Sequence, residues 1–364
     1  MFRSSIQQRN SLIIAVIFAI AAVFRFPCVD LRLSLRVLFE IFVTLTFAMY
    51  LWKINKWMAM FLVLAAFSIV IPYYGNVSLI SHMAFVSVFF GMVVYYIIVE
   101  TFTEKTVEYL YDAMCVIAIV NTLYMLMQFS GYDPLFKTKP GGEAHPVVGL
   151  MLNTNFTSAL LALCFPAFLR KKWCWFIPLV GVGFVLAKST GGILAVAVGL
   201  AVYFIAMGHR FATIIPVLIM FFFLLFVDKN FSPKDVRLEA WQYALELYKK
   251  HWIMGSGIGN WKIIGVLKNP HLQNQGWTAL HNDFIQALFE MGIGFVILLC
   301  GYFYDIFKRF KEKALIPLVA LIIISVNAMF NFPFHIGTTA MIAVVWLAIL
   351  EIFLKEDLCQ KKVK

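Results

Sequence analysis

The sequence predicts an all-α, polytopic integral membrane protein with about twelve transmembrane helices. Three observations lead to this prediction: 62% of the 364 residues are hydrophobic, only 13% are charged, and apolar runs recur along the whole chain. A soluble domain carries about 25% charged residues, so the shortage of charge indicates that most of the surface faces lipid. The mean hydropathy of +0.86 and the 37 Phe, 14 Tyr and 9 Trp suit lipid contact and interfacial belts.

Apolar runs define the candidate spans of a single membrane domain, residues 1–364. The first run lacks a small-residue cleavage site after it, so we expect it to be retained and not removed as a signal peptide. Several runs are shorter than the roughly 20 residues that cross a bilayer as a helix, which fits tilted, broken or half-spanning segments. The predicted spans are 11–27, 35–52, 57–73, 79–99, 109–129, 147–169, 173–187, 191–207, 212–227, 279–304, 314–330 and 335–354.

The distribution of Lys and Arg predicts that both termini lie in the cytoplasm. With the N-terminus inside, the inside loops and tails hold 17 basic residues, including the Arg170-Lys171-Lys172 run. The short loops on the other side hold four, or six if Arg25 and Arg36 at the span ends are added. This positive-inside bias also accounts for most of the net charge of +11. No basic stripe interleaved with aromatic residues occurs, so we expect no nucleic-acid partner.

Residues 228–278 form a long extracytoplasmic loop between the ninth and tenth spans. A loop of this length is usually functional or disordered, and its four Trp residues argue against disorder. Within it, residues 236–252 place apolar and charged side chains on different faces, which predicts an amphipathic helix at the outer membrane surface. The glycines of GSGIGNW (255–261) predict a tight turn and a close approach of backbones.

The stretch TALHNDFIQALFEMG (278–292) is unusually polar for the start of a membrane helix. Asn282, Gln286 and Glu290 lie at positions i, i+4 and i+8 and share a helix face, with His281 at the mouth of that face. Such groups either face a wet cavity with a functional role, or cap the helix and hydrogen-bond a neighbouring helix. Both interpretations stay open for all of these residues except His281, for which we favour catalysis.

The predicted topology brings other polar residues to the same extracytoplasmic face, among them Lys188, Arg237 and Asn155. A reaction on an anionic, lipid-anchored substrate fits this composition. Arg237 could bind a diphosphate through its fork of donors, Lys188 could add a point charge, and a neutral His281 could take a proton from an attacking hydroxyl. The candidates for substrate binding are Lys188, Asn282, Gln286, Trp241 and Asn155. Trp241 could instead be an interfacial or loop-core side chain. Asn155 could instead form a hydrogen bond that ties two helices together.

Motifs for metal and nucleotide chemistry are missing from the sequence. It contains no DxD, HExxH or GxxxxGK[ST] motif, which disfavours a metal-dependent nucleotide-sugar transferase and ATP hydrolysis. The six Cys residues have no CxxC spacing and lie mostly in or beside apolar runs. We therefore expect free, packing thiols, no metal site and no cofactor.

Four segments together resemble the O-antigen ligase and polymerase superfamily of bacterial membrane glycosyltransferases. They are GLMLNTNFTSALLALCFPAFL (149–169), VRLEAWQYALELYKKHWIMGSGIGNW (236–261), HNDFIQALFEMGIGFVILL (281–299) and NFPFHIGTTAMIAVVWLAIL (331–350). They occur in the order found in the family and span most of residues 149–350, whereas residues 1–130 match only in hydropathy.

The resemblance implies a glycan donor on an undecaprenyl diphosphate carrier at the outer leaflet of the bacterial cytoplasmic membrane. An acceptor hydroxyl of a glycan, lipid or protein would attack the anomeric carbon, with inversion and without a metal. The key histidine of the family corresponds to His281 and its loop arginine to Arg237. The family often has a second arginine near the start of the eighth span, where this chain reads AKSTGGILAV (187–196). Lys188 could replace its charge there but not its bidentate geometry.

Three alternatives remain open from the sequence. A ligase and a repeat-unit polymerase of a surface polysaccharide would use the same chemistry on different acceptors. A transporter of lipid-linked glycans could also have twelve spans, although transporters often show repeated halves and functional groups near the bilayer midplane, which this chain does not clearly show. A catalytically inactive assembly partner is the third.

Overall fold

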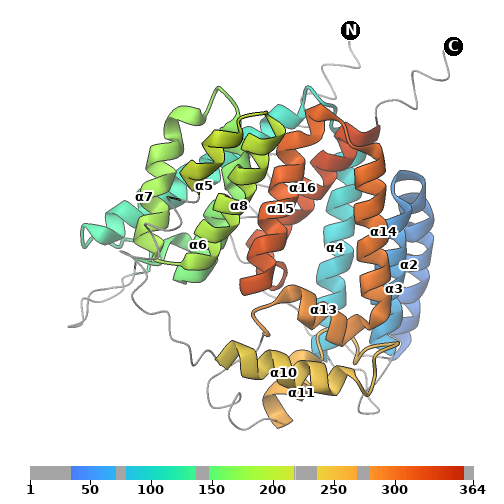
Figure 1. The fold of residues 1–364 in the computed structure, drawn as a ribbon. Helices are drawn as coiled ribbons and strands as arrows, with labels where there is room; N and C mark the ends of the chain where they lie inside the picture. Colours follow the sequence, from blue (N-terminus) through green and yellow to red (C-terminus); the bar gives the residue numbers. More distant parts are fainter. Residues whose placement is uncertain are drawn as a thin grey trace, which may run out of the picture. The chain divides into compact units, whose positions relative to one another are not determined.

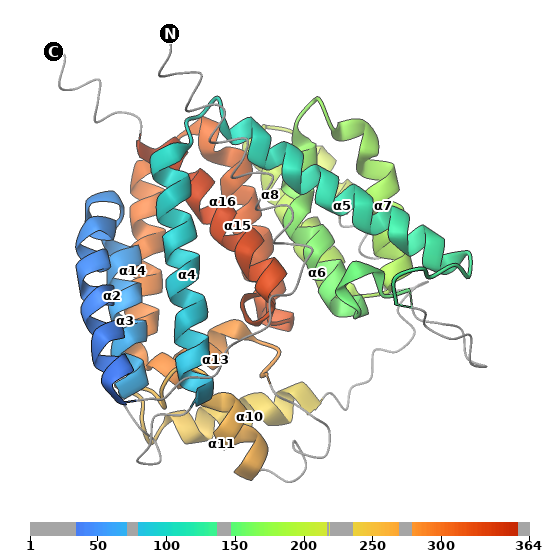
Figure 2. The same ribbon diagram turned by 180° about the vertical axis from the view of Figure 1, so that it is seen from behind.

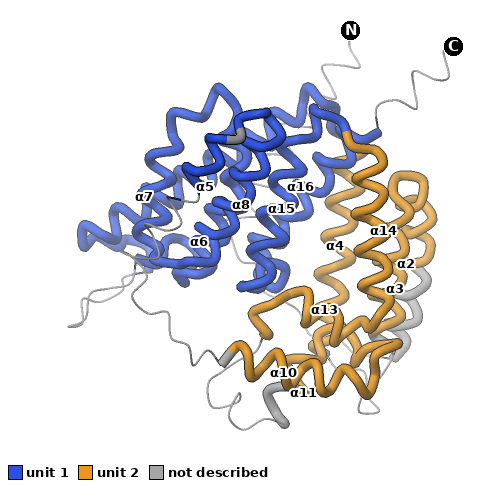
Figure 3. Tube along the Cα trace, viewed as in Figure 1, with its two compact units in different colours: residues 1–25, 100–231, 311–364 blue, residues 26–99, 232–310 orange. Residues whose placement is uncertain are grey.

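The computed structural model describes residues 34–70, 79–136, 147–216, 218, 236–268 and 279–355. Helix makes up 81% of the structure and the described residues contain no strand, so the predicted all-α class is confirmed. The chain forms two compact units, coloured separately in Figure 3. Unit 1 comprises residues 1–25, 100–231 and 311–364, and unit 2 comprises residues 26–99 and 232–310.

Unit 1 is a helical bundle in which short connections join antiparallel neighbours (Figures 1 and 2). Gly192 and Gly199 let α8 pack closely on α6 and α15, because a Cβ at Gly199 would lie 2.7 Å from Cδ1 of Ile323. The indole nitrogen of Trp346 donates to the Leu163 carbonyl at 2.7 Å and ties α16 to α6. The α-helices are α5 (Val107–Phe129), α6 (Thr154–Cys164), α7 (Ile177–Ala187), α8 (Thr190–Ala206), α15 (Leu315–Phe330) and α16 (Gly337–Lys355).

Unit 2 combines long apolar helices with a group of shorter ones. Asn55 separates α2 from α3, and its side chain accepts from the Trp57 nitrogen at 2.9 Å, which caps the start of α3. Gly301 makes room for the Trp57 ring, so α14 packs closely on α3. The α-helices are α2 (Ser34–Ile54), α3 (Lys56–Val70), α4 (Leu79–Thr101, in this unit up to residue 99), α10 (Val236–Tyr248), α11 (Trp261–Lys268), α13 (Asp283–Met291) and α14 (Ile293–Arg309).

Four helices in the described part of the chain are long and apolar enough to cross a membrane. They are Ile80–Thr101, Val107–Phe129, Glu312–Phe330 and Gly337–Lys355. Five shorter apolar helices of 10–17 residues, in the segments 43–54, 56–68, 154–169, 174–187 and 190–206, also fall in predicted spans. The first predicted span, 11–27, and most of the ninth, 212–227, lie outside the described residues, so the number twelve stays a prediction.

The tenth predicted span is where the structure departs from the expected helix pattern. The sequence predicts one span over residues 279–304, but the chain forms two helices there, α13 and α14, with a break at Gly292. Gly292 has a positive φ of 69°, a conformation that favours glycine and does not continue an α-helix. The short helix α13 therefore carries the polar stretch separately from the apolar α14.

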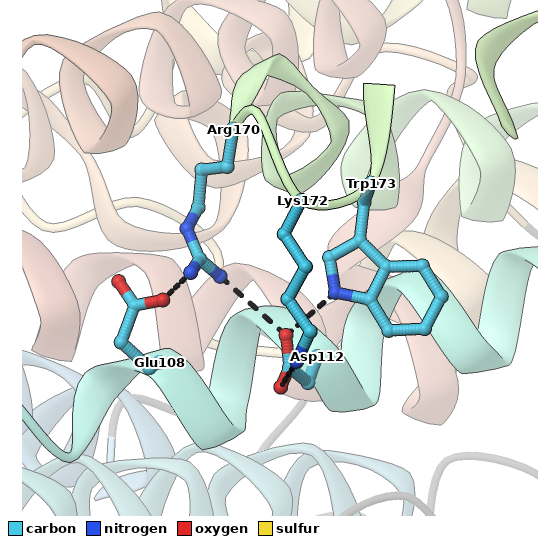
Figure 4. Close-up of polar contacts among 5 residues, drawn as sticks. All are labelled: Glu108, Asp112, Arg170, Lys172 and Trp173. Atoms are coloured by element: carbon cyan, nitrogen blue, oxygen red, sulfur yellow. Dashed lines mark hydrogen bonds and ion pairs between the residues drawn. The ribbon is translucent and has the colours of Figure 1, made fainter. Parts of the chain in front are cut away.

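Four basic residues predicted to face the cytoplasm pair with acidic residues of the segment 100–112 in unit 1, and Figure 4 shows two of them, Arg170 and Lys172. Arg170 pairs with Glu108 and lies 3.6 Å from Asp112, which also accepts from Lys172 and from the Trp173 indole, each at 2.6 Å. Burial lowers the pKa of Arg170 from its usual value. Two further pairs, Lys313 with Glu104 and Lys355 with Glu100, join other connections of the same unit.

Candidate functional site

The described part of the long loop folds into a small apolar core with α13. Ala240 and Ala244 of α10 are fully buried, and they pack with Trp261, Leu280 and Phe289. The rings of Trp261 and Phe289 meet edge to face with centroids 5.6 Å apart. The predicted helix and its apolar face are thus confirmed over Val236–Tyr248, whereas its position at the outer membrane surface stays a prediction. Protein covers that face, so the amphipathic pattern of α10 is explained without lipid.

His281 lies directly before α13 in a strained backbone conformation. Its φ is +52°, which costs of order 1–3 kcal/mol for a residue other than glycine and persists only where neighbouring contacts enforce it. Its side chain is half-buried. On its C-terminal side, the Asn282 side chain accepts from the Ile285 nitrogen at 3.0 Å and caps α13. The helix-capping interpretation of Asn282 is therefore confirmed, whereas its predicted contact with substrate stays a prediction.

Hydrogen bonds hold the residue before His281 from two sides. The Leu280 nitrogen donates to Oε1 of Gln286 at 3.1 Å. The Leu280 carbonyl accepts from the indole nitrogen of Trp241 at 2.7 Å. Trp241 is thus a tie between α10 and the segment that precedes α13, which is the loop-core role that the sequence left open for it.

Gln286 and Glu290 continue this set of bonds along α13. Nε2 of the Gln286 side chain donates to Oε1 of Glu290 at 3.1 Å. The same Oε1 accepts from the backbone nitrogen of Trp261 at 3.3 Å. Gln286 is 3% and Glu290 4% exposed, so both polar groups are withdrawn from solvent and need these partners. Substrate binding by Gln286 stays a prediction beside this structural role.

The glycine-rich turn makes the close backbone approach that its sequence predicted, and the structure shows that its partner is the end of α13. The nitrogens of Ser256 and Gly257 donate to the carbonyls of Phe289 and Glu290 at 2.9 and 2.8 Å. A Cβ at Gly255 would lie 2.6 Å from the Gly292 nitrogen, so only glycine allows this approach. These bonds satisfy carbonyls that the helix break leaves without a helical partner.

Arg237 lies in the first turn of α10 and is half-buried. Trp241 follows it by four residues and therefore lies on the same face of the helix. Because Trp241 bonds to Leu280, α10 brings Arg237 and His281 into one packed substructure within unit 2. The two residues to which the sequence assigned the chemistry thus belong to one local fold.

Lys188 and Asn155 lie together in unit 1, at the junction of α6, α7 and α8. Lys188 ends α7 with a φ of +50° and its side chain is exposed. The next residue, Ser189, donates through its hydroxyl to Oδ1 of Asn155 at 2.8 Å. Asn155 thus ties α6 to the start of α8, which the sequence allowed as its structural role. Substrate contacts of both residues stay predictions.

Asn327 of α15, four residues before the C-cap residue Asn331, is a buried polar residue that the sequence pattern did not single out. Asn327 is fully buried, and among the described residues neither polar atom of its side chain has a hydrogen-bond partner. Asn331 is 6% exposed and packs against Gly191. A Cβ at residue 191 would lie only 2.8 Å from Nδ2 of Asn331. The signal in the sequence was two asparagines four apart in an apolar helix, a pattern that seldom occurs without a packing or binding role.

Among the described residues, neither the apolar cavity beside α2, α3 and α14 nor a cluster of potential metal ligands adds another candidate site. A cavity of about 590 Å³ lies among α2, α3 and α14, but only apolar residues such as Met49, Trp52 and Phe67 and one glycine line it. It offers no charged side chain to a diphosphate. Within the described ranges, no three His, Cys, Asp or Glu residues are grouped as metal ligands, and the described cysteines at 115, 164, 174 and 300 are free thiols.

Comparison with known proteins identifies the region that carries this site. No curated protein matches the chain in sequence. The family model described as O-antigen ligase matches residues 175–300, a segment that contains Lys188, Arg237, Trp241, His281, Asn282 and Gln286 but not Asn155. This match and the apolar helices support an integral membrane protein of polysaccharide biosynthesis. The match at residues 175–300 confirms the resemblance of this chain to the O-antigen ligase superfamily.

Proposed function

We propose that the protein transfers a glycan from an undecaprenyl diphosphate carrier to an acceptor hydroxyl at the outer face of the bacterial cytoplasmic membrane. The family match supports glycan transfer of the ligase or polymerase type in general. The observation that carries the finer proposal is the bond from Trp241 to Leu280, which ties α10, the helix that contains Arg237, to the residue before His281.

His281 is the proposed general base. A neutral imidazole nitrogen takes the proton of the acceptor hydroxyl as its oxygen forms a bond to the anomeric carbon. The bond from that carbon to the diphosphate oxygen breaks, and undecaprenyl diphosphate leaves with the electron pair. Attack opposite the leaving group inverts the anomeric centre, and the step needs no metal ion.

Arg237 is the proposed diphosphate ligand. Its guanidinium can donate two parallel hydrogen bonds to phosphate oxygens and stabilise the negative charge that grows on the leaving group. Lys188, in unit 1, stays a prediction as a diphosphate contact, and as a point charge it cannot form that fork. The remaining candidates have hydrogen bonds within the protein; they are Asn155, Trp241, Asn282 and Gln286. We therefore propose His281 and Arg237 as the catalytic residues.

Reconstituted protein tests this proposal. Purified protein in lipid vesicles receives an undecaprenyl-diphosphate oligosaccharide and candidate acceptors in the presence of EDTA, and the release of undecaprenyl diphosphate is measured. We expect release with transfer, and a loss of about 10²- to 10⁴-fold in His281→Ala. The matched control is His209→Ala, which removes an exposed histidine outside the site.

The products distinguish the possible activities. Transfer to a foreign acceptor identifies a ligase, and lengthening of the glycan identifies a polymerase. Full activity of a well-folded His281→Ala variant would remove the base assigned here. Loss of activity in EDTA that added metal restores would contradict the metal-independent step, and movement of the lipid between leaflets without release would support a transporter.

A further inference from the structure

The hydrogen bonds around Leu280 form a set that ends directly before the proposed base. We propose that Trp241, Gln286 and Glu290 are positioning residues that fix His281 by holding the Leu280 peptide groups on both sides. This inference rests on the proposed function for its effect on catalysis, because a base needs a defined position only where it takes part in a reaction.

The contacts around His281 explain how its backbone keeps a positive φ. On one side, Leu280 is bound at its nitrogen by Gln286 and at its carbonyl by Trp241, at 3.1 and 2.7 Å. On the other side, the backbone nitrogen of Gln286 donates to the Asn282 carbonyl at 3.0 Å, which is the first hydrogen bond of α13. The strained residue is thus held between two bonded neighbours, which is how such a conformation persists.

Glu290 determines which way the Gln286 amide points. The Glu290 Oε1 accepts from the Gln286 amide nitrogen and from the Trp261 nitrogen. Because Nε2 of the Gln286 side chain donates to Glu290, the side-chain oxygen Oε1 of Gln286 faces the backbone nitrogen of Leu280 and accepts its hydrogen bond. A buried carboxylate thus orients an amide, which in turn orients the backbone before His281. Each member is buried or half-buried, so water competes little for these bonds.

A base that shifts by about 1 Å can lose about 100-fold in rate while the substrate still binds. We therefore expect Gln286→Leu, which removes both side-chain bonds at similar volume, to lower kcat by about 100-fold with little change in KM. Trp241→Phe, a milder change that keeps an aromatic ring, should lower kcat less. Gln242→Leu on the exposed face of α10 is the matched control and should behave as wild type.

A double variant separates positioning from charge. In Gln286→Glu with Glu290→Gln, the new carboxylate can accept from both the Leu280 nitrogen and the new amide nitrogen. Because both original bonds end on the same Oε1 of Glu290, the new amide nitrogen restores the bond to residue 286, and the bond from the Trp261 backbone nitrogen is lost. Gln286→Glu alone places two carboxylates side by side and removes the donor between them. We expect the single variant to lose activity and the double variant to regain part of it, because the two bonds that hold Leu280 and residue 286 are restored.

A second readout does not depend on activity. Diethyl pyrocarbonate acylates histidines, and mass spectrometry of the peptide that contains His281 gives the rate at that residue. We expect a changed rate in Gln286→Leu and a rate closer to wild type in the double variant than in Gln286→Glu. Wild-type kcat and acylation rate in a folded Gln286→Leu protein would overturn the proposal, as would a double variant that stays as inactive as the single one.

The two readouts also separate this inference from the proposed function. If wild-type protein releases no undecaprenyl diphosphate but the acylation rate of His281 still follows the variants, the positioning of His281 stands and the transfer reaction does not. If Gln286→Leu fails to fold, the same comparison between Trp241→Phe and Gln242→Leu decides, and equal acylation rates of His281 in both would overturn the proposal.

Discussion

Single residues in the 281–290 segment show what a polar pattern in an apolar chain can and cannot predict. The spacing of Gln286 and Glu290 predicted a shared helix face, and their hydrogen bond confirms it. The partner of Glu290 is Trp261, 29 positions away, and no local pattern gives a contact at that separation. The sequence could therefore locate the buried polar groups, but only the fold shows that they bind backbone and each other.

Arg237 is the residue where the chemistry depends most on geometry. Lysine keeps the charge but offers no planar fork to two phosphate oxygens. Since a hydrogen bond to a charged group contributes about 1.5–3 kcal/mol, we expect Arg237→Lys to lower kcat/KM about 10- to 100-fold in the vesicle assay. Lys262→Arg, an exposed basic exchange on α11 of the same unit, is the control. Wild-type kcat/KM in Arg237→Lys would show that the fork binds no diphosphate.

At the scale of elements, α10 was predictable and the break between α13 and α14 was not. The periodicity of residues 236–252 predicts a helix whatever covers its apolar face. In contrast, the hydrophobic run continues through MGIGFVILL (291–299), so the sequence pattern alone favours one helix. The glycine-rich turn decides the outcome, because its nitrogens bind the carbonyls of Phe289 and Glu290. The Ile293 nitrogen also bonds to the Trp252 carbonyl at 2.8 Å.

Gly255 tests whether this turn holds the break in place. Alanine there meets the Gly292 nitrogen and the Glu290 carbonyl at less than contact distance. We expect Gly255→Ala to destabilise the protein by about 2 kcal/mol or more and to lower the Tm measured in detergent. Gly131→Ala is the control, because Gly131 also has a positive φ but a Cβ at this position would meet no atom within 4 Å. Equal Tm changes in the two variants would show that close packing at Gly255 contributes nothing.

At the scale of the whole molecule, charge predicted which connections of unit 1 lie at one end, but not what they do there. Arg170, Lys172, Lys313 and Lys355 were expected only as positive charge in inside loops. Each instead has a carboxylate partner on the segment 100–112, where acidic residues recur every four positions. The positive-inside rule counts Lys and Arg and gives little weight to acidic residues, so it located this end without predicting the ion pairs.

The orientation of the chain in the membrane follows from this charge distribution and can be measured directly. Lys171 is exposed at the end of unit 1 that carries the ion pairs, and Gln242 is exposed on α10 in the long loop. In a background without native cysteines, Lys171→Cys and Gln242→Cys are labelled in cells with a maleimide that cannot cross the cytoplasmic membrane. We expect Gln242→Cys to react in intact cells and Lys171→Cys only after lysis, because the positive-inside rule predicts that the basic connections face the cytoplasm. The reverse pattern would place His281 and Arg237 on the cytoplasmic side, where a donor displayed on the outer leaflet could not reach them.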